Sequence, residues 1–440
     1  MNLVYGIKDK PKFGQLLIFA FQQVLAILAA TIAVPAIVGN GMSASAALFG
    51  AGVGTLVYQL FTKFRSPVFL GSSFAFISSM LAAFAGAASA SAGFAGIILG
   101  AVFAGLVYVI IALVVKLAGV KWINKLMPPV VIGPTVALIG LSLAGAAIKD
   151  VFSYGPQDAN GSFIMSGPAW ASLVCALVTL LTVVLVSTYG KKMTKLIPFI
   201  IGILAGYAVA AIFTVCGIPV IDFSLFQNMQ IFAVPEFTFL TALKGVKEIN
   251  ASYVATVAVA YVPVAFVVFA EHIADHKNLS TIIDKDLLED PGLHRTLLGD
   301  GVGSIAGAIF GGCPNTTYGE SVGCVAITRN ASVVTITTAA IMCLVISFFG
   351  PFVAFLDSIP GCVMGGVCIT LYGFIACSGL KMIQKVDLGQ NKNLFVVASI
   401  LIPGIGGMAM AIGKVTLTTT ACALILGIIV NLLLSKAKEE

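Results

Sequence analysis

Charged residues are scarce in this chain. Only 10% of its 440 residues are Asp, Glu, Lys or Arg, whereas soluble domains carry about 25%. Hydrophobic residues make up 59% of the sequence, which leaves too little polar surface for a soluble globular domain. The composition therefore predicts an integral membrane protein.

Motifs for several kinds of chemistry are also missing. The nine cysteines show no CxxC pair and no pattern of cysteine with histidine at metal-ligand spacing. The chain has no Walker A loop, GxSxG elbow, HExxH helix or GxGxxG turn, and this disfavours ATP-driven transport and a membrane enzyme. We expect no cofactor. Because membrane-embedded carboxylates remain, a proton gradient is the expected energy source.

Long apolar runs are what the sequence does contain. About fourteen stretches of spanning length lie between Phe13 and Leu434, some of them short or broken. These runs are too long and too unalternating for barrel strands, so an all-α polytopic bundle is predicted. The first run, 13–38, has no cleavage site of small residues and is interpreted as a retained span.

Basic residues mark one side of the membrane. If Met1 is cytoplasmic, alternate connections hold 20 of the 24 Lys and Arg residues. This asymmetry predicts an even number of spans with cytoplasmic N- and C-termini. The net charge of +6 is thus an orientation signal, and no nucleic-acid partner is expected. The opposite side keeps Lys149, Lys244, Lys247 and Lys414.

Two pairs of segments repeat along the chain. Residues 127–133 resemble 359–365, and the tract 71–75 is mirrored by 315–319 with two hydroxyls, an aromatic and a small residue. The second pair lies seven spans apart, an odd number, so the two copies face opposite ways. Inverted repeats with broken spans predict a transporter site near the midplane. The alternative is that small hydroxyl residues only help helices to pack.

Glu320 follows the second mirrored tract, and a carboxylate at membrane depth usually marks a substrate or ion path. Backbone N–H groups at the start of a half-helix would donate to a ligand carbonyl while Glu320 accepts from ligand N–H groups. A flat heterocycle with alternating N–H and C=O groups fits this pattern. Alternatively, Glu320 is a structural acid bonded to nearby hydroxyls.

Glu271 and Asp275 are four residues apart, hence on one face of a helix, where two carboxylates can form a proton-accepting pair. The alternative is that they are the wetted end of a span. Phe74, in the first mirrored tract, would offer its ring face to a planar ligand. Gln22 and Gln23 lie within the first span and indicate an interior hydrogen-bonding role, either in positioning a substrate or in bonding helix to helix.

The tract 314–329, PNTTYGESVGCVAITR, resembles the signature of the nucleobase/ascorbate transporters, also called nucleobase:cation symporter-2. Similar segments are LGSSFAF at 70–76, AEHI at 270–273 and DPGLHR at 290–295, and the likeness runs over essentially the whole chain. With PNTTYGE and AEH, the chain looks most like the bacterial uracil permeases among these transporters.

This resemblance implies fourteen spans arranged as two inverted seven-span repeats, with short β-strands in broken spans 3 and 10. It implies a core domain (13–118 and 253–357), a gate domain (119–217 and 358–436) and an external loop (218–252). A homodimer in the cytoplasmic (inner) membrane, in contact with lipid, is also implied.

The implied function is proton-coupled import of uracil, or a close pyrimidine, by alternating access of core against gate. Glu271 and Glu320 would hold the ring edge, and Glu271, with Asp275 and Glu320, would serve proton coupling. The other implied substrate-binding residues are Phe74, Tyr318, Gly319, Ala30 and Ser321. A xanthine-type purine symporter of the same fold and a nucleobase channel or facilitator remain alternatives.

Three departures from the resembled pattern bear on substrate choice. Ser321 stands where an Asn is usual after the acid, and one hydroxyl cannot replace the bonding of an amide. Gln23 stands where a His is usual, and Asp275 where uracil permeases often have a second His. The exact nucleobase is therefore open at this stage.

Overall fold

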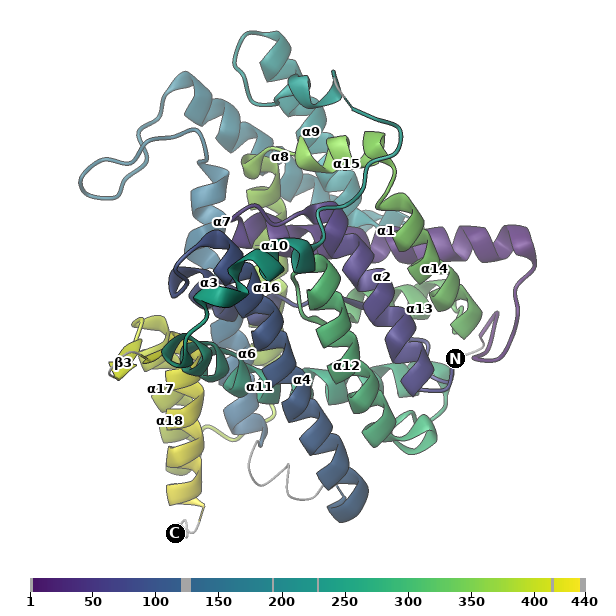
Figure 1. Cartoon of the computed structure of the whole chain (residues 1–440), viewed down its shortest axis with the longest axis vertical. Coiled ribbons are helices and arrows are strands. Elements are labelled where there is room, and N and C mark those ends of the chain that lie inside the picture. Colours follow the sequence, from purple (N-terminus) through teal and green to yellow (C-terminus); the bar gives the residue numbers. More distant parts are fainter. Residues whose placement is uncertain (1–2, 120–127, 192–193, 228, 413–414, 436–440) are drawn as a thin grey trace.

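The computed structural model describes residues 3–119, 128–191, 194–227, 229–412 and 415–435 (Figure 1). Some basic residues used for orientation, and Met127 of the first repeat pair, lie outside the described residues. These basic residues are Lys121, Lys125, Lys192, Lys414, Lys436 and Lys438.

Helices dominate the described part of the chain, so the prediction of a helical membrane protein is confirmed. Eight helical segments in the described residues are long and apolar enough to cross a membrane, one of them made of α6 and α7 together, and shorter apolar helices accompany them. The count of fourteen spans stays a prediction. The helices are α1 Phe13–Val38, α2 Ala44–Phe61, α3 Ile77–Ala85, α4 Ala90–Ala118, α6 Pro129–Ser142, α7 Ala144–Val151, α8 Gly167–Tyr189, α9 Pro198–Val215, α10 Thr238–Gly245, α11 Ala251–Ile283, α12 Leu293–Gly311, α13 Gly319–Thr328, α14 Val333–Ile346, α15 Gly350–Asp357, α16 Gly361–Ile383, α17 Asn391–Ile405 and α18 Thr419–Leu434.

Side chains at the helix starts explain where several helices begin. The side chain of Ser43 accepts from Ala46 N before α2, and Asn250 accepts from Tyr253 N before α11. Such caps satisfy one of the free N–H groups of the first turn. α11 ends where Asp284 takes a left-handed conformation.

The helices pack in two groups. α2, α4, α11 and α12 pack together, with α1 and α14 against α2 (Figure 1). α6 packs against α16 and α17, and α8 packs against α9 and α16. The crossing of α2 on α12 needs glycine, because a Cβ on Gly50 would lie 2.6 Å from Gly307 O. The two groups follow the proposed core and gate segments, whose boundaries stay a prediction.

Two short strands interrupt the helices inside the first group. β1 (Leu70–Ser72) pairs antiparallel with β2 (Asn315–Thr317), and Gly71 lies opposite Thr316. The tracts that mirror each other in sequence are therefore partners in space. The short helix η1 (Phe74–Phe76) follows β1, and α13 follows β2, so each strand leads into the start of a helix.

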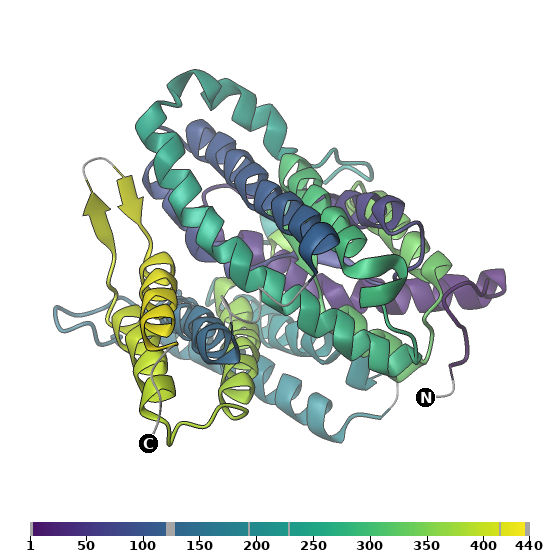
Figure 2. The same ribbon diagram turned by 90° about the horizontal axis from the view of Figure 1, so that it is seen from below.

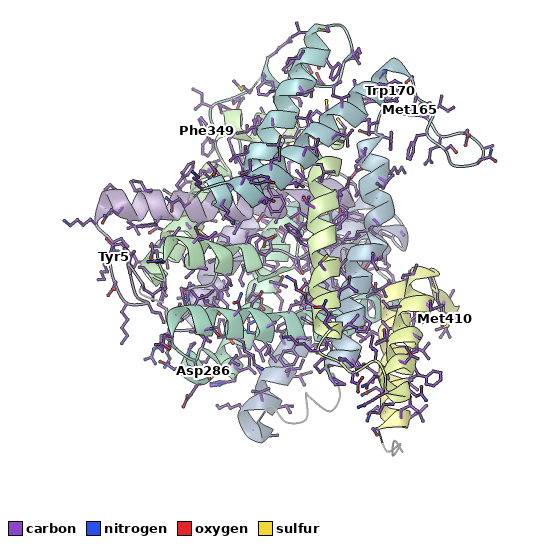
Figure 3. All side chains as sticks on the ribbon, turned by 180° about the vertical axis from the view of Figure 1, so that it is seen from behind. Tyr5, Met165, Trp170, Asp286, Phe349 and Met410 are labelled. Carbon is purple, nitrogen blue, oxygen red and sulfur yellow. The ribbon has the colours of Figure 1, made fainter. Side chains whose placement is uncertain are left out.

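A hairpin of two further strands links the two groups. β3 (Met410–Ile412) pairs with β4 (Val415–Leu417) between α17 and α18, and β4 packs against α11. Figure 2 shows this hairpin extending beyond the α17 and α18 pair. The labelled residues in Figure 3 mark opposite ends of the molecule, with Trp170 and Phe349 at one end and Asp286 at the other.

Candidate functional site

A cavity of about 230 Å³ lies where the paired strands, α11 and the α6 and α16 helices meet. It is smaller than the roughly 300–1,000 Å³ of pockets for drug-sized ligands. The tips of both broken segments and the predicted carboxylates reach it. Its lining residues are Ser73, Phe74, Ala75, Val136, Ile139, Glu271, Ala274, Asp275, Thr316, Thr317, Tyr318, Gly319, Glu320, Leu371, Phe374, Ile375, Ser378 and Met382.

One face of α11 supplies two of the carboxylates. Glu271 and Asp275 are one turn apart and both line the cavity, as the i, i+4 spacing predicts. Thr317 Oγ1 donates a hydrogen bond of 3.0 Å to Asp275 Oδ2. Among the described residues, Glu271 receives no side-chain hydrogen bond, so its carboxyl group is available to a ligand.

The start of α13 supplies the third carboxylate. Glu320 lies in the first turn of α13, and no side chain caps that helix. η1 also begins without a side-chain cap, at Ser73. The first N–H groups of a helix have no partner within it, and they carry partial positive charge. Two helix starts that face one cavity thus offer hydrogen-bond donors beside carboxylate acceptors.

Phe74 and Tyr318 occupy equivalent repeat positions but make different contacts. The half-buried Phe74 contacts Tyr372 of α16 edge-on, with ring centroids 6.2 Å apart. Tyr318 is buried, and its hydroxyl donates to Ser72 O at 2.6 Å. Its ring fills the space above Gly71, where a Cβ would lie 2.4 Å from a ring carbon. Phe74 is thus the ring available for stacking, while Tyr318 also braces β1 against β2.

Ser321 and Ala30 do not line the cavity. Ser321 is buried, and its Oγ accepts from Gln23 Nε2 and, at 3.2 Å, from Phe69 N. The residue therefore ties α1 and the segment before β1 to α13. Ala30 is 1% exposed within α1. The interior hydrogen-bonding role predicted for Gln23 is this link to Ser321.

Sequence reasoning missed the opposite wall of the cavity. α6 contributes Val136 and Ile139, and α16 contributes mostly apolar residues between Leu371 and Met382. The repeat pair 127–133 and 359–365 leads into these two helices, and was the one available signal. Apolar residues in apolar spans do not show which of them face a cavity.

Sequence reasoning also missed a buried polar cluster behind the cavity. His272 Nδ1 lies 2.6 Å from Asp300 Oδ2, and its Nε2 lies 2.9 Å from Thr296 Oγ1. Both side chains of the His272 and Asp300 pair are fully buried. His276, one turn on, bonds through Nε2 to the hydroxyl of Tyr58 at 2.7 Å. This cluster fixes α11 against α12 and α2.

The charge of the cavity limits its ligands. Its lining residues include three carboxylates and no Lys, Arg or His. Within the described ranges, no group of three or more His, Cys, Asp or Glu residues is arranged to hold a metal ion. The site is therefore suited to a neutral or cationic ligand with N–H donors.

Comparison with known proteins agrees with this architecture. A family model described as "Permease family" matches residues 14–413. The chain is 39% identical to the "Uracil permease" of Bacillus subtilis (strain 168), covering 99% of this chain and 96% of that protein. Identity to the "Uracil permease" of Bacillus caldolyticus is 38%, over 98% and 94% of the two chains.

The fold is also similar to that of a solved structure with little sequence identity. The transmembrane domain of a cyanobacterium bicarbonate transporter, BicA, matches with a TM-score of 0.67 and 17% identity, over 97% of this chain and 100% of that one. With its apolar helices, the chain is a multi-pass membrane protein. By the family match and the identity of its relatives, it belongs to this permease family, the nucleobase/ascorbate transporters.

Proposed function

We propose that this protein imports uracil, or a close pyrimidine nucleobase, together with protons. The observation that carries the proposal is the cavity where the two inverted, broken segments meet beside three carboxylates. The relatives named uracil permeases, which match nearly the whole chain, support uracil as the ligand.

The cavity chemistry complements the edge of a pyrimidine ring. Uracil alternates N–H donors with C=O acceptors, so it needs acceptors and donors side by side. Glu320 accepts from a ring N–H, and the backbone N–H groups at the start of α13 donate to a carbonyl. Phe74 lies against the ring face. Glu271, when protonated, donates to one ring group and accepts from another.

Charge argues against an anionic substrate. An anion placed among Glu271, Asp275 and Glu320 would meet like charges with no lining cation to offset them. The structurally similar BicA is named a bicarbonate transporter, so the shared fold does not determine the substrate. A neutral single-ring base fits both the charge and the small volume of this cavity.

Proton coupling follows from the same carboxylates. A proton on Glu271 lets it donate to the ligand, and loss of that proton removes the donor and weakens binding. With basic loops cytoplasmic, the lining residues of α11 and α16 lie in the cytoplasmic halves of these helices. In this orientation the cavity faces inward, and alternating access moves the core against the gate.

The cellular setting is part of the proposal. The excess of Lys and Arg on alternate connections supports a cytoplasmic-membrane protein with both termini in the cytoplasm. The core and gate segments are proposed to move as separate bodies. A homodimer is proposed from the family resemblance.

Uptake of isotope-labelled uracil into proteoliposomes tests the proposal. We expect uptake to increase with an inward proton gradient and this dependence to disappear in Glu271→Gln. Glu289→Gln, which changes an exposed carboxylate outside the cavity, is the matched control and should behave as the unaltered chain. Gradient-dependent uptake that persists in Glu271→Gln would disprove the coupling role.

Two alternatives give different results in the same assay. If the substrate is a xanthine-type purine, that base will compete with labelled uracil better than unlabelled uracil does. A channel or facilitator would equilibrate uracil without accumulating it. Saturable accumulation above equilibrium would therefore exclude the channel.

A further inference from the structure

A second cavity, separate from the first, lies between the N-terminal residues, the end of α2 and the start of α14. It has a volume of about 360 Å³ and no lining residue in common with the nucleobase cavity. We call it the α14 groove. Its lining residues are Ile7, Lys8, Phe64, Val333, Val334, Thr337 and Thr338.

The groove is bounded by a chain segment that is fixed in place. Residues 3–9, here called the N-terminal strap, run beside the turn between α13 and α14 (Figure 3, near Tyr5). Ala331 N donates to Tyr5 O at 2.8 Å, and Val333 N donates to Ile7 O at 3.1 Å. These bonds hold the backbone next to Lys8, so the groove has a lysine positioned at its rim.

The wall that α14 contributes is apolar despite its two threonines. Thr337 Oγ1 donates to Val333 O at 3.0 Å, and Thr338 Oγ1 donates to Val334 O at 2.8 Å. Because both hydroxyl protons are donated within the helix, neither threonine needs a hydrogen-bond acceptor from a ligand in the groove.

An exposed apolar stripe continues from the groove along α14. Ile341 is 48% exposed and Val345 is 65% exposed, and both follow Val334 and Thr338 at helical spacing. The opposite side of α14 packs against α1 and α2. A chain of methylene groups could therefore lie in the groove and along this stripe.

One basic side chain lies at the entrance. Lys8 is exposed and lines the rim, and Lys63 directly precedes the lining residue Phe64 in the sequence. The acid of the strap, Asp9, accepts from Gly6 N at 2.7 Å. The lining residues thus include one lysine and no carboxylate, and this favours an anionic group at the mouth of the apolar groove.

We propose that the α14 groove binds an anionic phospholipid, with its phosphate at Lys8 and an acyl chain along α14. This combination matches the two parts of such a lipid: headgroups near a membrane surface attract basic side chains, and acyl chains bury against apolar surface. The proposal is independent of the substrate and of proton coupling.

Binding of phosphatidylglycerol and of phosphatidylcholine to the purified full chain tests this, measured by native mass spectrometry and by thermal stabilisation. Lys8→Ala should weaken phosphatidylglycerol binding about fivefold, the effect of one basic residue near an anionic surface. Thr338→Phe, which fills the groove without changing charge, should lower acyl-chain binding. Lys385→Ala, at an exposed lysine outside the groove, is the control.

Loss of the phosphatidylglycerol preference in Lys8→Ala and Thr338→Phe, with Lys385→Ala unchanged, supports the site. Equal loss in all three variants would mean diffuse charge attraction and would overturn it. Unchanged binding in Lys8→Ala would also overturn it. Equal stabilisation by inorganic phosphate and by phosphatidylglycerol would also overturn it, because the acyl chain and the groove would then contribute nothing. Each variant is first unfolded in phosphatidylcholine alone, which separates lipid binding from a folding defect.

Discussion

Two faces of α11 carry polar residues at the same spacing, but the residues of the two faces differ in how many of their polar atoms have hydrogen-bond partners. On the cavity face, Glu271 and Asp275 lie one turn apart, and the Thr317 hydroxyl donates to Asp275 only. On the buried face, His272 and His276 are also one turn apart, and their ring nitrogens all have partners. The helix thus separates groups that are left open to the cavity from groups that hold the helix in place.

The difference shows how burial and bonding together indicate a role. A buried polar group without a partner costs free energy, so a structural group must be bonded within the protein. A group that faces a cavity with few partners is available to a ligand instead. Substitutions on the two faces should therefore separate stability from transport.

The largest effect is expected on the buried face. His272→Ala would leave Asp300 buried without its partner, and loss of one member of a buried pair costs about 3–5 kcal/mol. Thermal unfolding of the purified protein should show a large decrease in stability. Glu271→Gln, on the other face, should unfold close to the unaltered chain.

The double variant His272→Leu with Asp300→Leu is the control. Replacing both members of a buried pair by apolar residues can be nearly neutral, so much of the lost stability should return. If His272→Ala alone unfolds like the unaltered protein, the two faces do not differ as described.

A medium effect is expected on the cavity face. Thr317→Val removes the hydroxyl that donates to Asp275 and keeps the side-chain shape. A hydrogen bond contributes about 0.5–1.5 kcal/mol net, which corresponds to a twofold to tenfold change in binding. Uracil affinity measured by calorimetry should change within this range. A change in unfolding alone, with affinity unaltered, would place Asp275 with the structural groups.

The smallest effect is expected beyond the end of α11, where groups meet water. Hydrogen bonds from Lys285 and Arg65 hold the pKa of Asp290 below its usual value. Because the pKa of Asp290 is lower in the folded than in the unfolded protein, its charge stabilises the folded state at pH values above the unfolded pKa. That stabilisation is lost as the pH falls through the folded pKa. Asp290→Asn should lower stability at neutral pH by less than about 1 kcal/mol, because the side chain is 44% exposed.

Thermal unfolding of Asp290→Asn and of the unaltered chain, measured across a range of pH, tests the contribution of the Asp290 charge. The difference between them should shrink toward acidic pH and should also shrink in high salt. A difference that grows on acidification would show that the charge of Asp290 is not the cause.

The sequence predicted the parts of the site that follow a geometric rule. The spacing of Glu271 and Asp275 places them on one helix face, and the mirrored tracts at 71–75 and 315–319 are paired in space. Hydrophobic run length predicted helices, because lipid leaves few other ways to satisfy the backbone. Whether these residues bind a nucleobase stays a prediction.

Other parts of the site depend on packing between distant helices. Ser321 follows Glu320 directly, but successive helix residues point about 100° apart, and Ser321 faces α1 instead of the cavity. Ala30 is apolar within an apolar helix, so its placement has no local signal. The partnership of His272 with Asp300 joins residues of two helices, and spacing alone does not show how such helices face each other.

The pairing of β1 with β2 has a consequence for biosynthesis. Its nearest partners in sequence, Ser72 and Asn315, are 243 residues apart (315 minus 72), with many spans between them. β1 therefore cannot pair until β2 has been synthesised, when more than half of the chain that follows β1 has left the ribosome. Such distant contacts make a late folding step. A truncated first half would thus carry Phe74 but would lack β2, α11, α13 and the three carboxylates of the cavity, so the cavity forms only in the later part of synthesis.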